Sequence, residues 1–133
     1  MAALFVVADT NTLLLVAEGD ILAELERLAG VVELVVPQSV ANELSGLAKN
    51  KGAPGRAAKL ALKLTARSRV EPTKLPGDDG LLEVARKLQG VVFTNDKRIQ
   101  VEAAKSGLKV IVARGAGRLA WRQAGSGSRA LEG

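Results

Sequence analysis

Five acidic residues stand where carboxylates can do chemistry together. Asp9 and Asp96 each end a short apolar run, and Asp78 and Asp79 stand where a helix is expected to begin. Glu43 lies within the apolar stripe expected for its helix, where a carboxylate is costly unless it is paired or bound to a cation. Because the chain contains no cysteine and no histidine, thiol nucleophiles, imidazole bases and Cys/His zinc sites are excluded.

A divalent cation would resolve the repulsion that several carboxylates in one cleft feel. Oxygen ligands favour Mg²⁺ or Mn²⁺ over zinc or copper, and such ions support an in-line displacement at phosphorus. The acids therefore predict a phosphodiesterase with Mg²⁺ or Mn²⁺ as its cofactor. Taken singly, Asp78 and Asp79 are better explained as the cap and first-turn acid of a helix. The hypothesis thus depends on all the acids meeting at one place.

An alternation of strands and helices is expected to bring the five acidic residues together. Apolar runs at residues 3–8, 31–36, 91–94 and 109–112 predict strands buried on both faces, with a further short strand at 69–71. Helical spacing predicts helices at residues 21–29, 40–47 (capped by Ser39), 56–67, 78–88 and 97–106. This order predicts an α/β fold, a three-layer sandwich with a mostly parallel central β-sheet flanked by helices. Ligands bind at the carboxyl edge of such a sheet, where Asp9 and Asp96 are expected to lie.

The chain length fits one domain. With 133 residues, of which 47% are hydrophobic, we expect a single nuclease-like domain over residues 1–119 and a flexible basic tail rich in Gly and Ser over 120–133. Its apolar runs are shorter than a membrane span, and the N-terminus lacks the pattern of a secretory signal. We therefore expect a cytoplasmic protein with no membrane partner.

The charges alternate along the chain. Residues 1–46 carry seven acids and one base, and residues 75–96 carry four acids and two bases. Residues 47–74 and residues 97–129 each carry eight bases and one acid. This pattern predicts an acidic site flanked by basic surfaces that suit a polyanion such as nucleic acid. The basic residues expected to contact this nucleic acid are Lys49, Lys51, Arg56, Lys97, Arg98, Arg114 and Arg118.

Four motifs occur in an order that resembles the PIN-domain ribonuclease family. They are Val-Ala-Asp-Thr-Asn at 7–11, Pro-Gln-Ser-Val-Ala-Asn-Glu-Leu at 37–44, Asp-Asp-Gly-Leu-Leu-Glu-Val-Ala at 78–85 and Val-Val-Phe-Thr-Asn-Asp at 91–96. The resemblance covers residues 3–112. It implies that Mg²⁺ or Mn²⁺ is bound by Asp9, Glu43, Asp78 or Asp79, and Asp96, with Thr10, Asn11, Thr94 and Asn95 in support.

One departure from the family pattern is Gly80, at a position where helix-favouring residues are common. The glycine leaves the choice between Asp78 and Asp79 as the main ligand open. Helical phase favours Asp78, which lies three residues before the apolar Leu81.

The resemblance implies a metal-dependent endoribonuclease that hydrolyses RNA phosphodiester bonds. Residues 55–59 and 112–119 resemble the branch related to ribosomal RNA processing, which would make an rRNA precursor the partner. The second branch is the VapC-type toxin, whose site is masked by an antitoxin protein. A catalytically silent RNA-binding scaffold is the alternative from a different class, and a homodimer is a further expected assembly.

Overall fold

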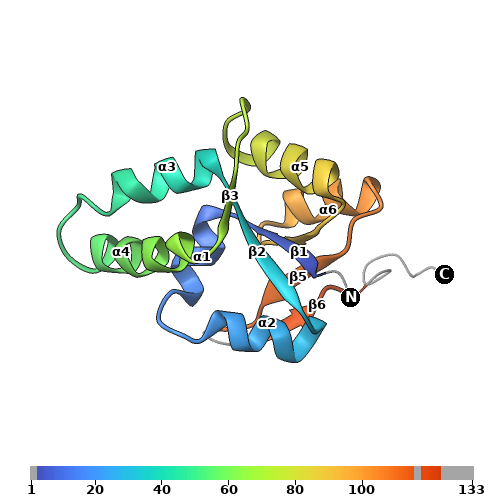
Figure 1. Cartoon of the computed structure of the whole chain (residues 1–133), viewed down its shortest axis with the longest axis horizontal. Helices are drawn as coiled ribbons and strands as arrows, with labels where there is room; N and C mark the ends of the chain where they lie inside the picture. Colours follow the sequence, from blue (N-terminus) through green and yellow to red (C-terminus); the bar gives the residue numbers. More distant parts are fainter. Residues whose placement is uncertain (1–2, 116–117, 124–133) are drawn as a thin grey trace.

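The computed structural model describes residues 3–115 and 118–123, which form one six-stranded sheet in the order β3-β2-β1-β4-β5-β6 (Figure 1). The strands are β1 (Leu4–Ala8), β2 (Val32–Pro37), β3 (Arg69–Glu71), β4 (Val91–Phe93), β5 (Val110–Ala113) and β6 (Leu119–Trp121). The first five strands pair in parallel, and β6 is antiparallel to β5. The mostly parallel sheet predicted from the sequence is therefore confirmed.

The predicted tail boundary after residue 119 falls inside β6. Residues 120 and 121 continue the sheet because the backbone of this segment pairs with β5, as Ile111 with Trp121 and Val112 with Ala120. The remainder of the predicted tail, residues 124–133, lies outside the described residues.

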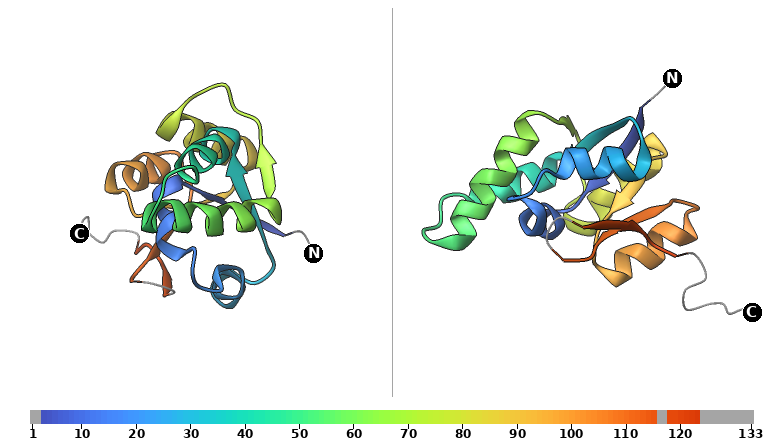
Figure 2. Two further views of the ribbon diagram at one scale, coloured as in Figure 1. Left: turned by 90° about the vertical axis from the view of Figure 1, so that its left-hand side faces the viewer. Right: turned by 90° about the horizontal axis from the view of Figure 1, so that it is seen from below.

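Helices cover both faces of the sheet, as Figure 2 shows. One face carries α1 (Thr10–Val16), α2 (Ile21–Ala29), α3 (Gln38–Leu47) and α4 (Ala53–Ala66), and the other carries α5 (Gly77–Leu88) and α6 (Lys97–Lys105). Successive side chains of β1 point to opposite faces: Val6 and Ala8 pack in the core under α1–α4, and Val7 packs in the core under α5 and α6. This is the predicted three-layer sandwich.

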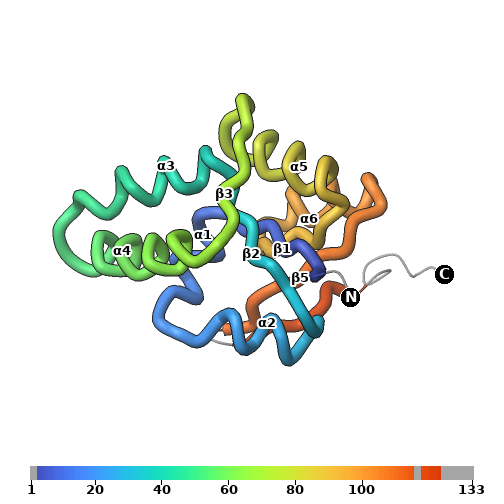
Figure 3. Tube along the Cα trace, viewed as in Figure 1, coloured from blue at the N-terminus to red at the C-terminus, as the bar shows by residue number. Residues whose placement is uncertain are grey.

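One helix was not predicted, and three others begin at positions other than those predicted. Helix α5 begins at Gly77, one residue before its predicted start. Helix α1 was not predicted; it begins directly after Asp9, whose carboxylate caps it. Helix α3 begins at Gln38, so Ser39 lies in its first turn and is not its cap. Helix α4 begins at Ala53 because Pro54, in the first turn, lacks the N–H that the start of a helix leaves unpaired. The tube in Figure 3 shows α3 and α4 as an antiparallel pair that extends beyond the sheet.

The sheet changes its winding direction between β1 and β4. From β1 the chain moves outward through β2 to β3, and it then returns through α5 to pair β4 with the opposite side of β1. Val7 is therefore flanked by Val35 on β2 and Val92 on β4. In open parallel sheets such a switch point leaves a crevice at the carboxyl ends of the two strands. Here that crevice lies beside Asp9 and Thr94.

Glu71 fastens the edge strand β3 to helix α5. Its buried carboxylate accepts hydrogen bonds from Lys87 Nζ at 2.9 Å and from Arg69 Nε at 3.0 Å. The hydrogen bond from Lys87 is the main reason why the pKa of Glu71 lies below its ordinary value, and Arg69 adds to the effect. The contact helps to hold α5, which carries Asp78, in place against the sheet.

Gly80 allows α5 to pack closely at its first turn. A Cβ at this position would lie 2.4 Å from the carbonyl oxygen of Leu75 and 3.2 Å from the Ser39 hydroxyl. The departure from the family pattern thus has a steric reason, because any side chain here would push the loop before α5 outward.

We predict that Gly80→Ala lowers the free energy of unfolding by about 1–3 kcal/mol, the usual cost of overpacking. Gly46→Ala is the matched control, since Gly46 also lies in a helix and a Cβ there meets nothing within 4 Å. The control should be neutral or stabilising by up to about 1 kcal/mol. Urea denaturation of both variants measures the difference, and equal stabilities would contradict the steric account.

Candidate functional site

A small pocket of about 170 Å³ opens at the carboxyl end of β1. Four carboxylates from four elements line it, together with hydroxyl and amide side chains: Asp9, Glu43, Asp78, Asp96, Thr10, Asn11 and Ser39. The structure thus brings together four of the five acids named from the sequence. Asp79 is the exception, since it is exposed on α5 and does not line the pocket.

Asp9 is held from two sides. Its Oδ1 accepts a hydrogen bond from the Thr12 backbone N–H at 2.8 Å, which caps α1, and its Oδ2 accepts one from the Thr94 hydroxyl at 2.5 Å. The same Thr94 oxygen accepts a hydrogen bond from the Asp96 backbone N–H at 3.0 Å. Thr94 is fully buried, so its hydroxyl ties the end of β1 to the end of β4 and fixes two of the acids relative to each other.

Asp96 and Asn95 face different partners. Asp96 caps α6 by accepting hydrogen bonds from the backbone N–H groups of Arg98 at 2.9 Å and Ile99 at 3.1 Å. The Asn95 amide donates to the Ala113 carbonyl at 2.9 Å and accepts from the Ala113 N–H at 2.8 Å. Asn95 does not line the acidic pocket, and its hydrogen bonds to Ala113 connect the segment after β4 to β5.

Glu43 is exposed, which corrects the prediction that it lies on the buried stripe of its helix. The buried residues of α3 are Val40, Ala41 and Leu44, and Glu43 falls beside them at the rim of the pocket. Its Oε1 accepts a hydrogen bond from the Thr10 hydroxyl at 2.6 Å. Thr10 is therefore the residue that orients this carboxylate.

Asp78, which lines the pocket, forms an ion pair with Arg98, which does not. The two residues lie in the first turns of α5 and α6, and their side chains are 38% and 69% exposed. Arg98 was predicted to contact RNA, whereas in the structure its guanidinium is paired with Asp78.

Ser39 is a site residue whose part the sequence did not reveal. Its hydroxyl is buried at the pocket and has no hydrogen-bond partner among the described residues. The pattern around Ser39 resembled an ordinary helix cap, so only the tertiary packing shows that this hydroxyl faces the acids.

The other cations predicted to contact RNA lie outside the acidic pocket. Lys49, Lys51 and Arg56 are exposed in the connection between α3 and α4 and in the first turn of α4. Lys97 and Arg114 line a separate hollow of about 490 Å³, and Arg118 is exposed just before β6.

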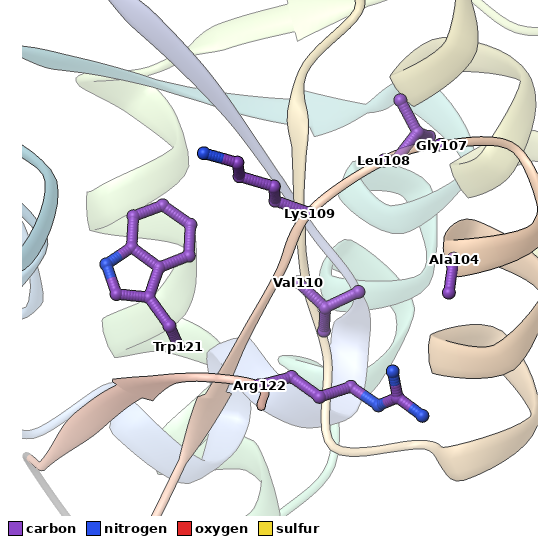
Figure 4. Close-up of a pocket in the computed structure, with 7 residues that line it drawn as sticks. All are labelled: Ala104, Gly107, Leu108, Lys109, Val110, Trp121 and Arg122. Carbon is purple, nitrogen blue, oxygen red and sulfur yellow. The ribbon is translucent and has the colours of Figure 1, made fainter. Parts of the chain in front are cut away.

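A third hollow, of about 500 Å³, lies between β6 and the turn that follows α6 (Figure 4). It is lined largely by apolar groups around Lys109, whose ammonium lies 5.7 Å from the centre of the Trp121 ring. No carboxylate or hydroxyl lines this hollow among the described residues. The smaller acidic pocket is therefore the candidate site.

Comparison with known proteins gives the same family as the motifs. A family model described as a PIN like domain matches residues 6–116. The chain is 34% identical over 107 residues to Ribonuclease VapC9 of Archaeoglobus fulgidus, an alignment that covers 78% of each protein. The chain belongs to the PIN-like domain family, and the predicted resemblance to PIN-domain ribonucleases is confirmed.

Solved structures share the fold at low sequence identity. A domain of a functionally unknown protein from Methanocaldococcus jannaschii matches with a TM-score of 0.61 and 20% identity, covering 86% of this chain and 94% of that one. A PilT N-terminus domain protein from Sulfolobus solfataricus matches with a TM-score of 0.50 and 14% identity, covering 81% and 86%. Within the described residues, no helix is long and apolar enough to cross a membrane.

The donors of the pocket suit a hard divalent cation in chemistry, since all of them are oxygens. The positions of these oxygens, however, do not form a ready coordination shell. In the described part of the chain, no group of three or more acidic side chains is placed so that it could hold a metal ion as it stands. Each carboxylate instead has its own partner, namely Thr94 and Thr12 for Asp9, Thr10 for Glu43, Arg98 for Asp78 and the start of α6 for Asp96.

We predict that Asp96 stabilises the fold by capping α6 and not by its negative charge. Asp96→Asn should stay within about 0.5 kcal/mol of the wild type in free energy of unfolding, because Asn caps a helix about as well as Asp. Asp96→Ala should lose about 0.5–2 kcal/mol, because the N–H groups of Arg98 and Ile99 lose their acceptor. Chemical denaturation without added metal measures both, and equal losses in the two variants would show that the charge matters and the cap does not.

Proposed function

We propose that this protein is a metal-dependent endoribonuclease that hydrolyses RNA phosphodiester bonds with Mg²⁺ or Mn²⁺. The observation that carries the proposal is the pocket in which Asp9, Glu43, Asp78 and Asp96 meet. Membership of the PIN-like domain family and the identity to a protein named as a ribonuclease support it. A chain without histidine or cysteine has few other means of cleaving a phosphodiester bond.

The four carboxylates of the pocket would hold the ion. A bound Mg²⁺ or Mn²⁺ supplies Lewis-acid polarisation of the attacked phosphate and neutralises the charge that develops during in-line displacement. Thr94 and Thr10 hold Asp9 and Glu43 by hydrogen bonds and so fix the orientation of these two carboxylates. The Ser39 hydroxyl, which also lines the pocket, is buried and has no hydrogen-bond partner among the described residues.

The VapC-type function is the better supported of the two branches. The relative that shows 34% identity is named as a VapC ribonuclease, and nothing comparable supports ribosomal RNA processing. We therefore propose a toxin-type ribonuclease with an antitoxin protein as its partner. Homodimer formation and an rRNA precursor as substrate are the less supported alternatives.

Cleavage of RNA with and without metal tests the proposal. We predict that the protein cleaves single-stranded or structured RNA in Mn²⁺ or Mg²⁺ and that excess EDTA abolishes cleavage. Asp9→Asn should lower the rate by about 100-fold or more, because even an outer partner of a metal ligand costs up to about that much when it is lost. The fold should persist, since Asn at this position can still cap α1.

Asp79→Asn is the matched control for Asp9→Asn. It removes the same charge from an acid that lies outside the pocket, and cleavage should stay close to that of the wild type. Full activity in excess chelator would refute the metal requirement. A similar loss in both variants would show that overall charge, and not the pocket, governs the activity.

Arg98 competes with the ion for Asp78 in this account. Freeing Asp78 by Arg98→Gln should tighten Mn²⁺ binding by up to about fivefold, because an exposed ion pair contributes at most about 1 kcal/mol. Titration calorimetry with MnCl₂ alone measures the change without reference to activity. Arg27→Gln is the control, since it also removes one exposed arginine that is paired with a glutamate, but on α2. Equal tightening in both variants, or weaker binding in Arg98→Gln, would contradict the competition.

A further inference from the structure

A basic hollow lies next to the acidic pocket. Lys97, Arg114 and Arg122 line it together with polar side chains, including Asn95 and Gln100, around a volume of about 490 Å³. Arg122 belongs to the segment predicted to be a flexible tail, and it was not among the predicted RNA contacts.

The two hollows share the start of α6. Asp96 and Ile99 line the acidic pocket, while Lys97 and Gln100 line the basic hollow. The first turn of α6 is therefore a ridge with the acids on one side and the cations on the other. A chain of phosphates that crosses this ridge would meet the acidic pocket at one position and the basic hollow at a neighbouring one.

Arg122 is held in place by the fold. Its backbone N–H donates to the Val110 carbonyl at 2.8 Å, and its Nε donates to Gln100 Oε1 at 3.1 Å. Figure 4 shows its side chain extending toward α6, whereas the ring of the preceding Trp121 points away from that helix. Gln100 is buried and in turn donates to the Thr94 carbonyl at 3.3 Å, so the hollow connects directly to the residue that orients Asp9.

The charge of the hollow is not compensated within the described part of the chain. Lys97, Arg114 and Arg122 form no ion pair there, and no acidic side chain lines the hollow. Two other cations of α6 differ in this respect, since Arg98 pairs with Asp78 and Lys105 pairs with Glu102. Three unpaired cations around a concave surface favour a ligand with more than one negative charge.

We propose that this hollow binds backbone phosphates of the RNA strand on one side of the bond that is cleaved. The inference rests on the proposed endoribonuclease function. The acidic pocket repels phosphates that lie outside the reach of a bound cation, so the flanking phosphates need basic partners nearby. Contacts of this kind position the strand and read no bases.

Salt dependence of RNA binding tests the hollow without any cleavage. The probe is a short, fluorescently labelled single-stranded RNA in EDTA, and its dissociation constant is measured by anisotropy over a KCl series. Arg122→Gln should lower the slope of log K against log salt by about 0.7, and Lys97→Gln/Arg114→Gln/Arg122→Gln should lower it by about 2, since each lost phosphate contact changes the slope by about 0.7. Arg122→Lys, which keeps the charge, should retain most of the slope.

Lys105→Gln is the matched control, because it removes one exposed cation from the same helix but outside the hollow. A slope for Arg122→Gln equal to that of Lys105→Gln would overturn the proposal, and so would a loss of affinity confined to one RNA sequence. If Arg122→Gln does not fold, as judged by its thermal melting, Lys97→Gln/Arg114→Gln provides the same test with an expected change of about 1.4 in slope.

The hollow and the proposed function can fail separately. In Mn²⁺, Arg122→Gln should raise KM and leave kcat nearly unchanged, because the contact binds the ground state and the transition state alike. If the protein cleaves RNA but the salt slopes of all variants equal that of the wild type, the endoribonuclease function is supported and phosphate binding in the hollow is refuted. Reduced slopes in a protein that cleaves no RNA would refute the endoribonuclease and, with it, the placement of the hollow beside a cleavage site.

Discussion

Four negative charges gathered at one edge of the sheet are the constraint on which the site depends. Carboxylates placed around a pocket of about 170 Å³ repel one another, and the fold must hold them there despite that repulsion. It does so by giving each carboxylate a donor of its own. Two donors are threonine hydroxyls, one is an arginine, and the others are the backbone N–H groups at the starts of α1 and α6. The hydroxyls of Thr10 and Thr94 thus hold Glu43 and Asp9 in place without metal, whereas the Arg98 pair occupies the Asp78 oxygen that an ion would need.

Thr94 connects this arrangement to the sheet. It directly follows β4, whose last residue pairs with β1, and its hydroxyl contacts both Asp9 and the backbone of Asp96. Its carbonyl accepts a hydrogen bond from the side-chain amide of Gln100. The amide oxygen of Gln100 in turn accepts a hydrogen bond from Arg122. The acidic pocket and the basic hollow are therefore built on one buried residue at the switch point of the sheet. Movement of β4 relative to β1 would disturb both.

The strands were predictable because their apolar runs are buried on both faces, which leaves a continuous signal in the sequence. Helical phase likewise distinguished Asp78, which lines the pocket, from Asp79, which does not. Helix α1 was missed because Thr10, Asn11 and Thr12 are weak helix formers, and its stability comes from the Asp9 cap and from buried packing. The three-residue strand β6 was missed because its pairing with β5 leaves no pattern of its own in so short a segment.

The finer geometry of the site could not be predicted from local patterns. The ion pair between Asp78 and Arg98 joins residues on two helices that only the packing of α5 against α6 brings together. Glu43 satisfied the spacing of a buried stripe, yet it lies at the rim, because the pocket takes the place of a packed neighbour on that side of α3. Ser39 and Arg122 acquire their surroundings only from tertiary contacts.

The location of a bound ion shows whether the four carboxylates form a metal site. Crystals of the protein grown or soaked with MnCl₂ would show the ion by its anomalous scattering. We expect a peak inside the pocket, in contact with carboxylate oxygens of Asp9 and of at least one other lining acid, with the Arg98 guanidinium displaced from Asp78. A fully occupied peak elsewhere on the molecule, or an empty pocket with the Asp78–Arg98 pair intact at saturating Mn²⁺, would contradict this expectation.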